Sequence, residues 1–184
     1  MIFKETNLKG NYLIDLEKKE DDRGFFSRFF CKKEFLEKGL NISWVQINNS
    51  FNKRKGTLRG LHFQRSPNEE IKLIRCLKGA IWDVVVDLRE NSKTFGKWFG
   101  TKLSDKNRRM MYVPKGFAHG FISLESKTEI LYLVSNFYKP SSEDTIIWND
   151  EDIGIEWPLN PVEISVKDLK GKIFKKTKSI KEKT

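Results

Sequence analysis

Short apolar segments separated by short polar turns recur from residue 80 onward, and this regular spacing is compatible with few folds. The apolar segments are AIWDVVVDL (80–88), KWFGTKL (97–103), RRMMYV (108–113), GFAHGFISL (116–124) and TEILYLVSNF (128–137). The residues between them, such as ENSKTFG (90–96) and PKG (114–116), are rich in turn formers. Short strands at such spacing predict an antiparallel β-sandwich or barrel.

The segments before residue 80 extend this pattern and add one helix. Strands are predicted for SWVQINNSF (43–51), GTLRGLHFQ (56–64) and KLIRCL (72–77). CKKEFLEKGL (31–40) is predicted to be a helix that stops at Gly39. The sequence contains no internal repeat and no alternation of strands with helices. We therefore expect a single all-β sandwich domain with a small helix.

The late segment 141–169 differs from the strands before it, because it mixes acidic turns with two tryptophans. Pro158 and Pro161 argue against a regular element between them. We expect this segment to pack across the sheet as a cover, with Trp148 and Trp157 in the core rather than in a site.

Length and charge indicate one domain with a tail. We predict a domain over residues 1–169 and a Lys-rich tail over residues 170–184. The tail holds seven Lys and one Glu, so it carries +6 of the net charge of +10. Because the basic residues gather at one end, a solvated terminus is the simpler interpretation and recruitment to an acidic partner is the alternative. Nucleic-acid binding is not expected.

The sequence also predicts a cytoplasmic protein without membrane contact. No apolar run approaches the ~18 residues of a membrane span. Residues 1–10 lack the apolar core of a secretory signal. Cys31 and Cys76 cannot build a disulfide framework, which favours a reducing compartment.

Histidine is scarce, and this bears on metal chemistry. His62 and His119 are the only two, and they form no H-x-H pair. A catalytic metal in a barrel takes about three His or carboxylate ligands, so the sequence argues against a metal site.

Both histidines lie in predicted strands and allow a structural or a functional interpretation. In LRGLHFQ (58–64), strict alternation places His62 on the same face as Gly60 and opposite Arg59. A lone strand histidine can be structural, yet an interior imidazole could serve as a general base near neutral pH. His119 has small neighbours, Ala118 and Gly120, which fit either tight sheet packing or space for a ligand.

Three arginines are candidates for anion binding, because a guanidinium group matches phosphate geometry. They are Arg23, Arg59 and Arg75. Each can equally be a surface ion pair.

Four motifs in order resemble the dTDP-4-dehydrorhamnose 3,5-epimerase family. They are RGLHFQ, KLIRCLKGAIWDVVVDLRENSKTFGKW, VPKGFAHGF and WNDEDIGIEWP, and the likeness runs from about Asp22 to Asp168. The resemblance implies a cupin-type jelly roll that binds a nucleotide sugar, works as a homodimer with sites completed across the interface, and needs no metal or cofactor.

The resemblance also implies roles for matching positions. His62 is expected to remove the sugar proton, with Asp168 as its carboxylate partner. Lys72 is expected beside the enolate oxygen, and Tyr132 is expected to return a proton from the opposite face. The expected substrate-binding residues are Arg23, Phe26, Gln46, Arg59, His119, Tyr138, Glu143 and Lys167. Among them, Arg23 and Arg59 resemble pyrophosphate contacts, Arg23 in a neighbouring subunit's site, and Tyr138 resembles the aromatic that stacks on the base.

The implied chemistry has a clear physical basis. A ketone at C4 acidifies the hydrogens on C3 and C5, because the carbanion delocalises onto the oxygen. Inversion then needs a base on one face of the ring and an acid on the other. A carboxylate beside a histidine fixes its tautomer and stabilises its protonated form.

Three positions depart from the family pattern and leave alternatives open. Arg28 stands where an acidic residue is common near the base, and Ile47 and Asn49 replace a common Asp and a polar or His position. The alternatives are a C3-only epimerase and an epimerase of another nucleotide-linked 4-keto sugar. A non-catalytic sugar-nucleotide-binding cupin or a polymer-associated protein is a more distant one.

Overall fold

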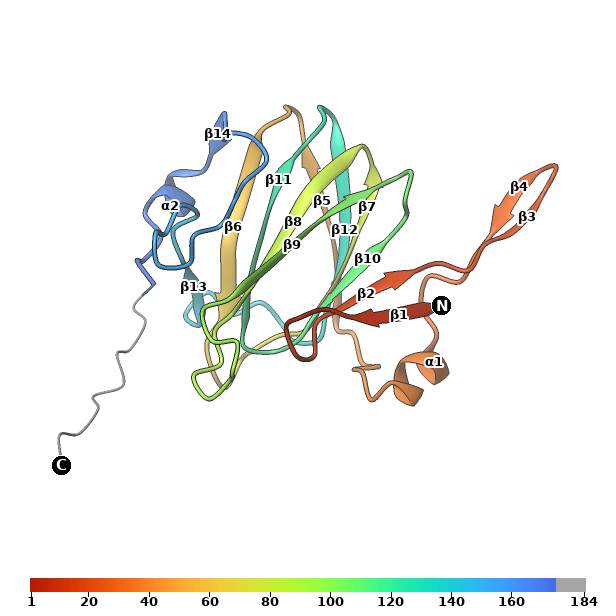
Figure 1. The fold of residues 1–184 in the computed structure, drawn as a ribbon, viewed down its shortest axis with the longest axis horizontal. Helices are drawn as coiled ribbons and strands as arrows, with labels where there is room; N and C mark the ends of the chain where they lie inside the picture. The colour runs from red at the N-terminus through yellow and green to blue at the C-terminus, as the bar shows by residue number, and fades with distance from the viewer. Residues whose placement is uncertain (175–184) are drawn as a thin grey trace.

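The computed structural model describes residues 1–174 and has two sheets packed face to face (Figure 1). The first sheet has the strand order β1-β2-β10-β7-β12-β5, and the second has the order β13-β6-β11-β8-β9 with β14 also beside β6. All pairs are antiparallel except β14 with β6. The elements are β1 (Ile2–Glu5), β2 (Tyr12–Asp15), β3 (Lys19–Asp21), β4 (Gly24–Phe26), α1 (Lys32–Glu37), β5 (Gln46–Asn52), β6 (Thr57–Gln64), β7 (Lys72–Lys78), β8 (Ala80–Asp87), β9 (Trp98–Ser104), β10 (Met110–Val113), β11 (Phe117–Ser123), β12 (Thr128–Val134), β13 (Glu143–Thr145), β14 (Glu163–Ile164) and α2 (Val166–Leu169).

The predicted all-β sandwich is confirmed, and each predicted strand has its counterpart among β5 to β12. The four strands before α1 were not predicted. They are only three or four residues long, which is too short for alternation to be recognised.

Apolar side chains form three clusters, one between the sheets and one on the outer face of each. The central cluster includes Ile74, Val85 and Phe121. The second cluster lies between the first sheet and α1, whose Phe35 is fully buried and meets Phe3 edge-on at 5.2 Å between ring centroids. The third cluster lies on the outer face of the second sheet, beneath the late segment of the chain.

Helix α1 confirms the predicted helix and its stop. Gly39 has φ +68°, a left-handed conformation that favours glycine, and its N–H bonds to the carbonyl of Leu36 at 2.9 Å. The helix therefore ends where the sequence indicated.

The late segment covers the second sheet, as expected. Trp157 packs, partly buried, against the third cluster and donates its indole N–H to the carbonyl of Trp148 at 2.9 Å. Trp148 belongs to none of the three clusters, so its expected place in the core was wrong. No regular element lies between Pro158 and Pro161. The described start of the tail continues this cover, since Phe174 is buried in the same cluster. The division at residue 169 stays a prediction, and residues 175–184 lie outside the described residues.

A bulge in β6 departs from the predicted alternation. His62 pairs with His119 and Arg59 pairs with Phe121, so three steps along β6 match two along β11. The extra residue turns Arg59 toward the face that carries His62, and the prediction of opposite faces was wrong. A Cβ on Gly60 (φ +122°) would lie 2.6 Å from the Cα of Gly120. The small residue at 120 therefore serves tight sheet packing.

The hairpin β3–β4 projects away from the sandwich, as Figure 1 shows. On this hairpin the ring of Phe25 lies 4.4 Å from the guanidinium carbon of Arg108 on the body and 5.2 Å from Nζ of Lys18, which directly precedes β3. Within residues 1–174, no helix is long and apolar enough to cross a membrane.

Candidate active site

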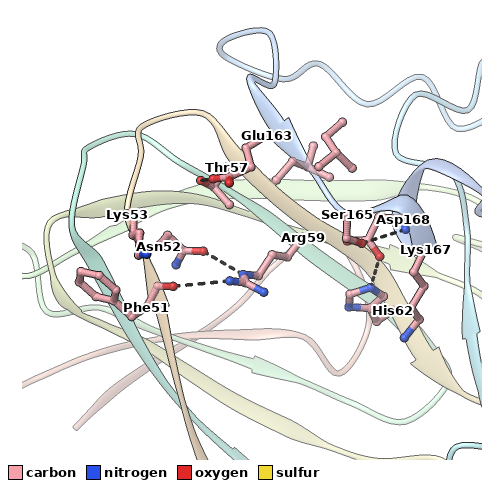
Figure 2. Close-up of a pocket in the computed structure, with 12 residues that line it drawn as sticks. Phe51, Asn52, Lys53, Thr57, Arg59, His62, Glu163, Ser165, Lys167 and Asp168 are labelled. Atoms are coloured by element: carbon pink, nitrogen blue, oxygen red, sulfur yellow. Dashed lines mark hydrogen bonds and ion pairs between the residues drawn. The ribbon is translucent and has the colours of Figure 1, made fainter.

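His62 and Asp168 form a hydrogen-bonded pair at the edge of β6. His62 Nε2 lies 2.6 Å from Asp168 Oδ1 (Figure 2). Asp168 lies on α2, and its backbone N–H donates to the hydroxyl of Ser165, the residue that caps this short helix. β14 pairs with β6 just before α2 and thereby brings Asp168 to His62. The predicted pairing of these two residues is thus present in the geometry.

The environment of Asp168 keeps it ionised. It is 3% exposed, and burial alone would raise its pKa. The hydrogen bonds from His62 and from the N–H of Gly60 (3.2 Å) outweigh burial and hold the pKa of Asp168 below its ordinary value. A fixed carboxylate on Nε2 leaves Nδ1 of His62 to exchange a proton.

Three adjoining cavities meet at His62, with volumes of about 610, 380 and 270 Å³. The largest runs from Phe51 past Arg59 to Lys167 (Figure 2). The other two lie between the sheets and share His62, Lys72, Tyr132 and Glu143. Such a divided space suits a ligand of several parts.

Tyr132 and Lys72 supply the wall opposite His62. They lie on the adjacent strands β12 and β7 of the first sheet, whereas His62 lies on the second. Burial raises the pKa of Tyr132, and the charges of Glu70 and Glu143 raise it further against the opposing effect of Arg59. The phenol is therefore a proton donor at neutral pH. Lys72 is 9% exposed, and its Nζ lies 3.1 Å from Glu70 Oε1.

His119 forms a second histidine–carboxylate pair beside the first. It lies opposite His62 on β11, and its Nε2 is 2.7 Å from Oδ1 of the fully buried Asp83. It lines the 270 Å³ cavity with His62 and Tyr132. Sequence reasoning missed Asp83, although a charged residue within the apolar run 80–88 was a visible signal.

A polar group borders the 380 Å³ cavity around Glu143. Tyr138 donates its hydroxyl to Glu143 Oε2 at 2.7 Å, and Lys167 Nζ lies 2.5 Å from Oε1. Gln46 accepts a hydrogen bond from the N–H of Tyr138 at 2.9 Å. The Tyr138 side chain stays 56% exposed. These four predicted residues are therefore brought together beside the catalytic candidates.

Arg59 supplies positive charge to the largest cavity. Its Nε donates to Asn52 Oδ1 at 2.9 Å, and one terminal nitrogen lies 3.5 Å from the carbonyl of Phe51. Among residues 1–174 it has no carboxylate partner. Its charge thus remains available to an anion. Asn52, which orients it, was not anticipated from the sequence.

Two predicted residues do not reach this site within one chain. Arg23 lies at the tip of the β3–β4 hairpin, where it pairs with Asp21 at 2.6 Å and its side chain is 89% exposed. Phe26 lies on the same hairpin and is also exposed. Arg75, the third candidate for anion binding, lies on the outer face of the first sheet with its guanidinium over the ring of Phe29.

Within residues 1–174, no group of three or more His, Cys, Asp and Glu side chains could hold a metal ion. Both histidines instead point a ring nitrogen at one buried carboxylate each.

Comparison with known proteins identifies the family. The family model for dTDP-4-dehydrorhamnose 3,5-epimerase matches residues 5–176. The chain is 46% identical over 170 residues to the dTDP-4-dehydrorhamnose 3,5-epimerase of Salmonella typhimurium, covering 91% of this chain and 92% of the relative. The crystal structure of the Elizabethkingia anophelis dTDP-4-dehydrorhamnose 3,5-epimerase matches with a TM-score of 0.91 and 43% identity, covering 95% of this chain and 96% of that one.

A third similar protein was solved with a sugar nucleotide. It is the dTDP-6-deoxy-D-glucose-3,5-epimerase of Legionella pneumophila in complex with dTDP-4-keto-L-rhamnose, with a TM-score of 0.88 and 39% identity over 94% of this chain and 92% of that chain. Sequence and fold therefore agree, and the cupin-type fold expected from the motifs is confirmed. The chain belongs to the dTDP-4-dehydrorhamnose 3,5-epimerase family and is an isomerase of this type.

Proposed function

We propose that the chain converts dTDP-4-dehydro-6-deoxy-D-glucose into dTDP-4-dehydro-L-rhamnose, in the biosynthesis of dTDP-L-rhamnose, with His62 as base and Tyr132 as acid. One observation carries this assignment: His62 and Tyr132 come from facing sheets and line the same cavities. A sugar ring between them would meet a base on one face and a proton donor on the other. The hydrogens leave and return as protons, so the reaction needs no redox cofactor.

Lys72 is the proposed partner of the C4 oxygen. Removing a proton from C3 or C5 moves negative charge onto that oxygen, and an ammonium in a nearly buried site stabilises it. Loss of one such donor costs roughly 3 kcal/mol in the transition state. The base and the acid each contribute about 10²- to 10⁴-fold. His119, held by Asp83, is the further polar contact proposed for the sugar.

Arg59 and Lys167 are the proposed contacts of the diphosphate, and Tyr138 is the proposed platform for the base. Arg59 lines the largest cavity and has no carboxylate partner in the described part of the chain, and an aromatic as exposed as Tyr138 can accept a stacked ring. Glu143 and Gln46 would orient Lys167 and Tyr138. The complex of the Legionella pneumophila relative with dTDP-4-keto-L-rhamnose supports a dTDP-sugar as the ligand.

A homodimer is the proposed assembly, with Arg23 and Phe26 completing the site of the other subunit. The projecting hairpin that carries both residues supports this, because β3 and β4 lie on the opposite side of the molecule from β6, the strand that carries His62 (Figure 1). The outer face of β5 also presents the exposed side chains of Ile47 and Phe51.

A cytoplasmic location is also proposed, since a reducing compartment suits two free cysteines.

The chemistry is tested by NMR of the reaction with dTDP-4-keto-6-deoxyglucose in D₂O. The wild type should place deuterium at both C3 and C5. His62→Ala should abolish uptake at both carbons, and uptake retained at both would refute the base. Tyr132→Phe should impair reprotonation more than abstraction, and full double inversion by this variant would refute the acid. Deuterium at C3 alone in the wild type would instead indicate a C3-only epimerase.

The shared site is tested by mixing two inactive variants, Arg23→Ala and His62→Ala. In hybrid dimers both lesions fall in one site and leave the other intact, so random mixing should restore about a quarter of all sites. Each variant alone, denatured and refolded in the same way, is the control. A mixture no more active than its parents would contradict a site built from two subunits.

A further inference from the structure

Glu70 forms an ion pair with Lys72 inside the site. It lies two residues before Lys72, in the loop that joins β6 to β7, and its Oε1 is 3.1 Å from Lys72 Nζ. Their side chains are only 12% and 11% exposed. A charge so poorly hydrated needs a partner, because removal of one member leaves the other buried without compensation.

Glu70 is itself held from several directions. Its second oxygen is within 3.4 Å of Gln64 Nε2, and Gln64 is buried and tied to the carbonyls of Asn68 and Phe137. The backbone of Ile71, between Glu70 and Lys72, exchanges two hydrogen bonds with Ser135 at the end of β12. The carboxylate is therefore fixed relative to both β6 and β12.

The cavities place Glu70 on one side of Lys72 only. Lys72 lines both cavities that hold His62 and Tyr132, whereas Glu70 lines the 380 Å³ cavity but not the 270 Å³ cavity that also holds His119. Lys72 is thus paired on one side and presents the other to the space between His62, His119 and Tyr132.

We propose that Glu70 is a positioning residue of the epimerisation, which acts by holding the ammonium of Lys72 in place for the developing enolate oxygen. This role rests on the proposed function, in which Lys72 faces that oxygen. Glu70 needs no contact with the reacting carbons. An ammonium on a flexible four-carbon side chain would otherwise sample several positions, and a misplacement of about 1 Å can cost about 10²-fold in rate.

Glu70 also acts on the proton donor across the cavity. Its negative charge is one of the causes that raise the pKa of Tyr132, after burial. The other charged or titratable groups that line a cavity with Tyr132 are Arg59 and His62 on β6, Lys72 on β7, His119 on β11, Tyr138 after β12 and Glu143 on β13. Loss of the Glu70 charge would therefore lower the pKa of Tyr132, and the phenol would deprotonate at lower pH.

Glu70→Gln tests the role, since it keeps the shape of the side chain and a contact to Gln64. We expect kcat to fall by about 10- to 100-fold with KM near its wild-type value. We also expect the basic limb of the kcat–pH profile to move to lower pH. Glu70→Asp, which keeps the charge, should return this limb toward the wild-type position and recover part of kcat. The matched control is Glu69→Gln, because Glu69 makes no ion pair within residues 1–174.

A double-mutant cycle with Lys72→Met separates this role from the proposed function. If Glu70 acts through Lys72, Glu70→Gln should change kcat little in the Lys72→Met background, with folding of each variant checked by thermal melting. Effects that multiply, or a Glu70→Gln variant indistinguishable from the Glu69→Gln control, would overturn the positioning role and leave the proposed function standing. Wild-type kcat in Lys72→Met would refute the role of Lys72 itself, and the role of Glu70 with it.

Discussion

The pairing of His62 with Asp168 can be tested sharply by Asp168→Asn. Asp168 accepts two hydrogen bonds in the structure, one from His62 at 2.6 Å and one from the N–H of Gly60 at 3.2 Å. An amide has only one oxygen for these two donors. If that oxygen meets Gly60, the amide nitrogen meets His62 Nε2, and Nε2 must then accept. The proton moves to Nδ1, the nitrogen that should act as the base.

The expected cost follows from these two contacts. In the productive tautomer the proton of His62 is on Nε2 and Nδ1 is free to act as the base. If the amide oxygen of the Asp168→Asn variant accepts from Nε2 to restore this tautomer, the N–H of Gly60 loses its acceptor, which costs about 1–3 kcal/mol. Losing the carboxylate removes a charged hydrogen bond to the imidazolium, worth roughly 1.5–3 kcal/mol. Together they amount to about 2.5–6 kcal/mol, which lowers kcat by about 10²- to 10⁴-fold.

The assay is the rate of deuterium uptake at C3 and C5 in D₂O, followed by NMR under saturating substrate. The matched control is Asp144→Asn, the same chemical change on β13, where Asp144 pairs with Lys172 and lines none of the three cavities. It should keep nearly wild-type uptake. If Asp168→Asn kept uptake within about threefold of the wild type, the carboxylate would contribute under about 1 kcal/mol, and the account of His62 as an oriented base would be refuted.

Two further predictions concern stability. Gly60→Ala should lower the free energy of unfolding by at least about 3 kcal/mol, because its Cβ would lie 2.6 Å from the Cα of Gly120. This corresponds to a fall in Tm of about 6–12 °C. The control is Gly154→Ala, at φ +65° with its nearest neighbour at 3.7 Å, which should lower the free energy of unfolding far less. Equal losses of stability in the two variants would contradict the explanation by close approach of Gly60 and Gly120. Asp87 is buried, yet hydrogen bonds from Arg89 and two hydroxyls outweigh burial and lower its pKa from 3.8 to about 2. A carboxyl pKa that is lower in the folded than in the unfolded protein stabilises the fold at any pH above the unfolded-state pKa. This stabilisation is lost as the pH falls through the folded-state pKa. Asp87→Asn should therefore lower the free energy of unfolding, measured in urea at pH 7, by about 2 kcal/mol. The cost should shrink at pH 3, and a constant difference would be evidence against this linkage.

Much of the sandwich was predictable because its strands are long enough to carry a pattern. The runs at 56–64, 80–88 and 116–124 became β6, β8 and β11, and Gly39 ended α1 as expected. The hairpin β3–β4 was missed because strands of three residues carry no readable period. Alternation alone also failed at Gly60, because a bulge depends on the neighbouring strand and leaves the apolar pattern of its own strand unchanged.

The site was predictable in its membership and less so in its supports. Residues 62 and 168 are 106 positions apart, and the family likeness, unlike periodicity, joined them; the fold then brings them to 2.6 Å. Asp83 and Glu70 were not predicted, because each contacts another, predicted residue: Asp83 pairs with His119, and Glu70 pairs with Lys72. Arg23 belongs to a hairpin that projects from the chain, and its proposed contacts are with another subunit. Its role therefore stays a prediction.

The docking of β14 and α2 onto β6 ties the activity to the last part of the domain to be synthesised. Asp168 follows every strand of both sheets in the sequence, so it can meet His62 only once the chain has been made up to residue 168. A chain interrupted before β14 and α2 would retain Lys72 and Tyr132 but would lack the carboxylate that orients His62. By the cost worked out for Asp168→Asn, such an unfinished chain would draw a proton from a keto sugar at least about 10²-fold more slowly than the finished one.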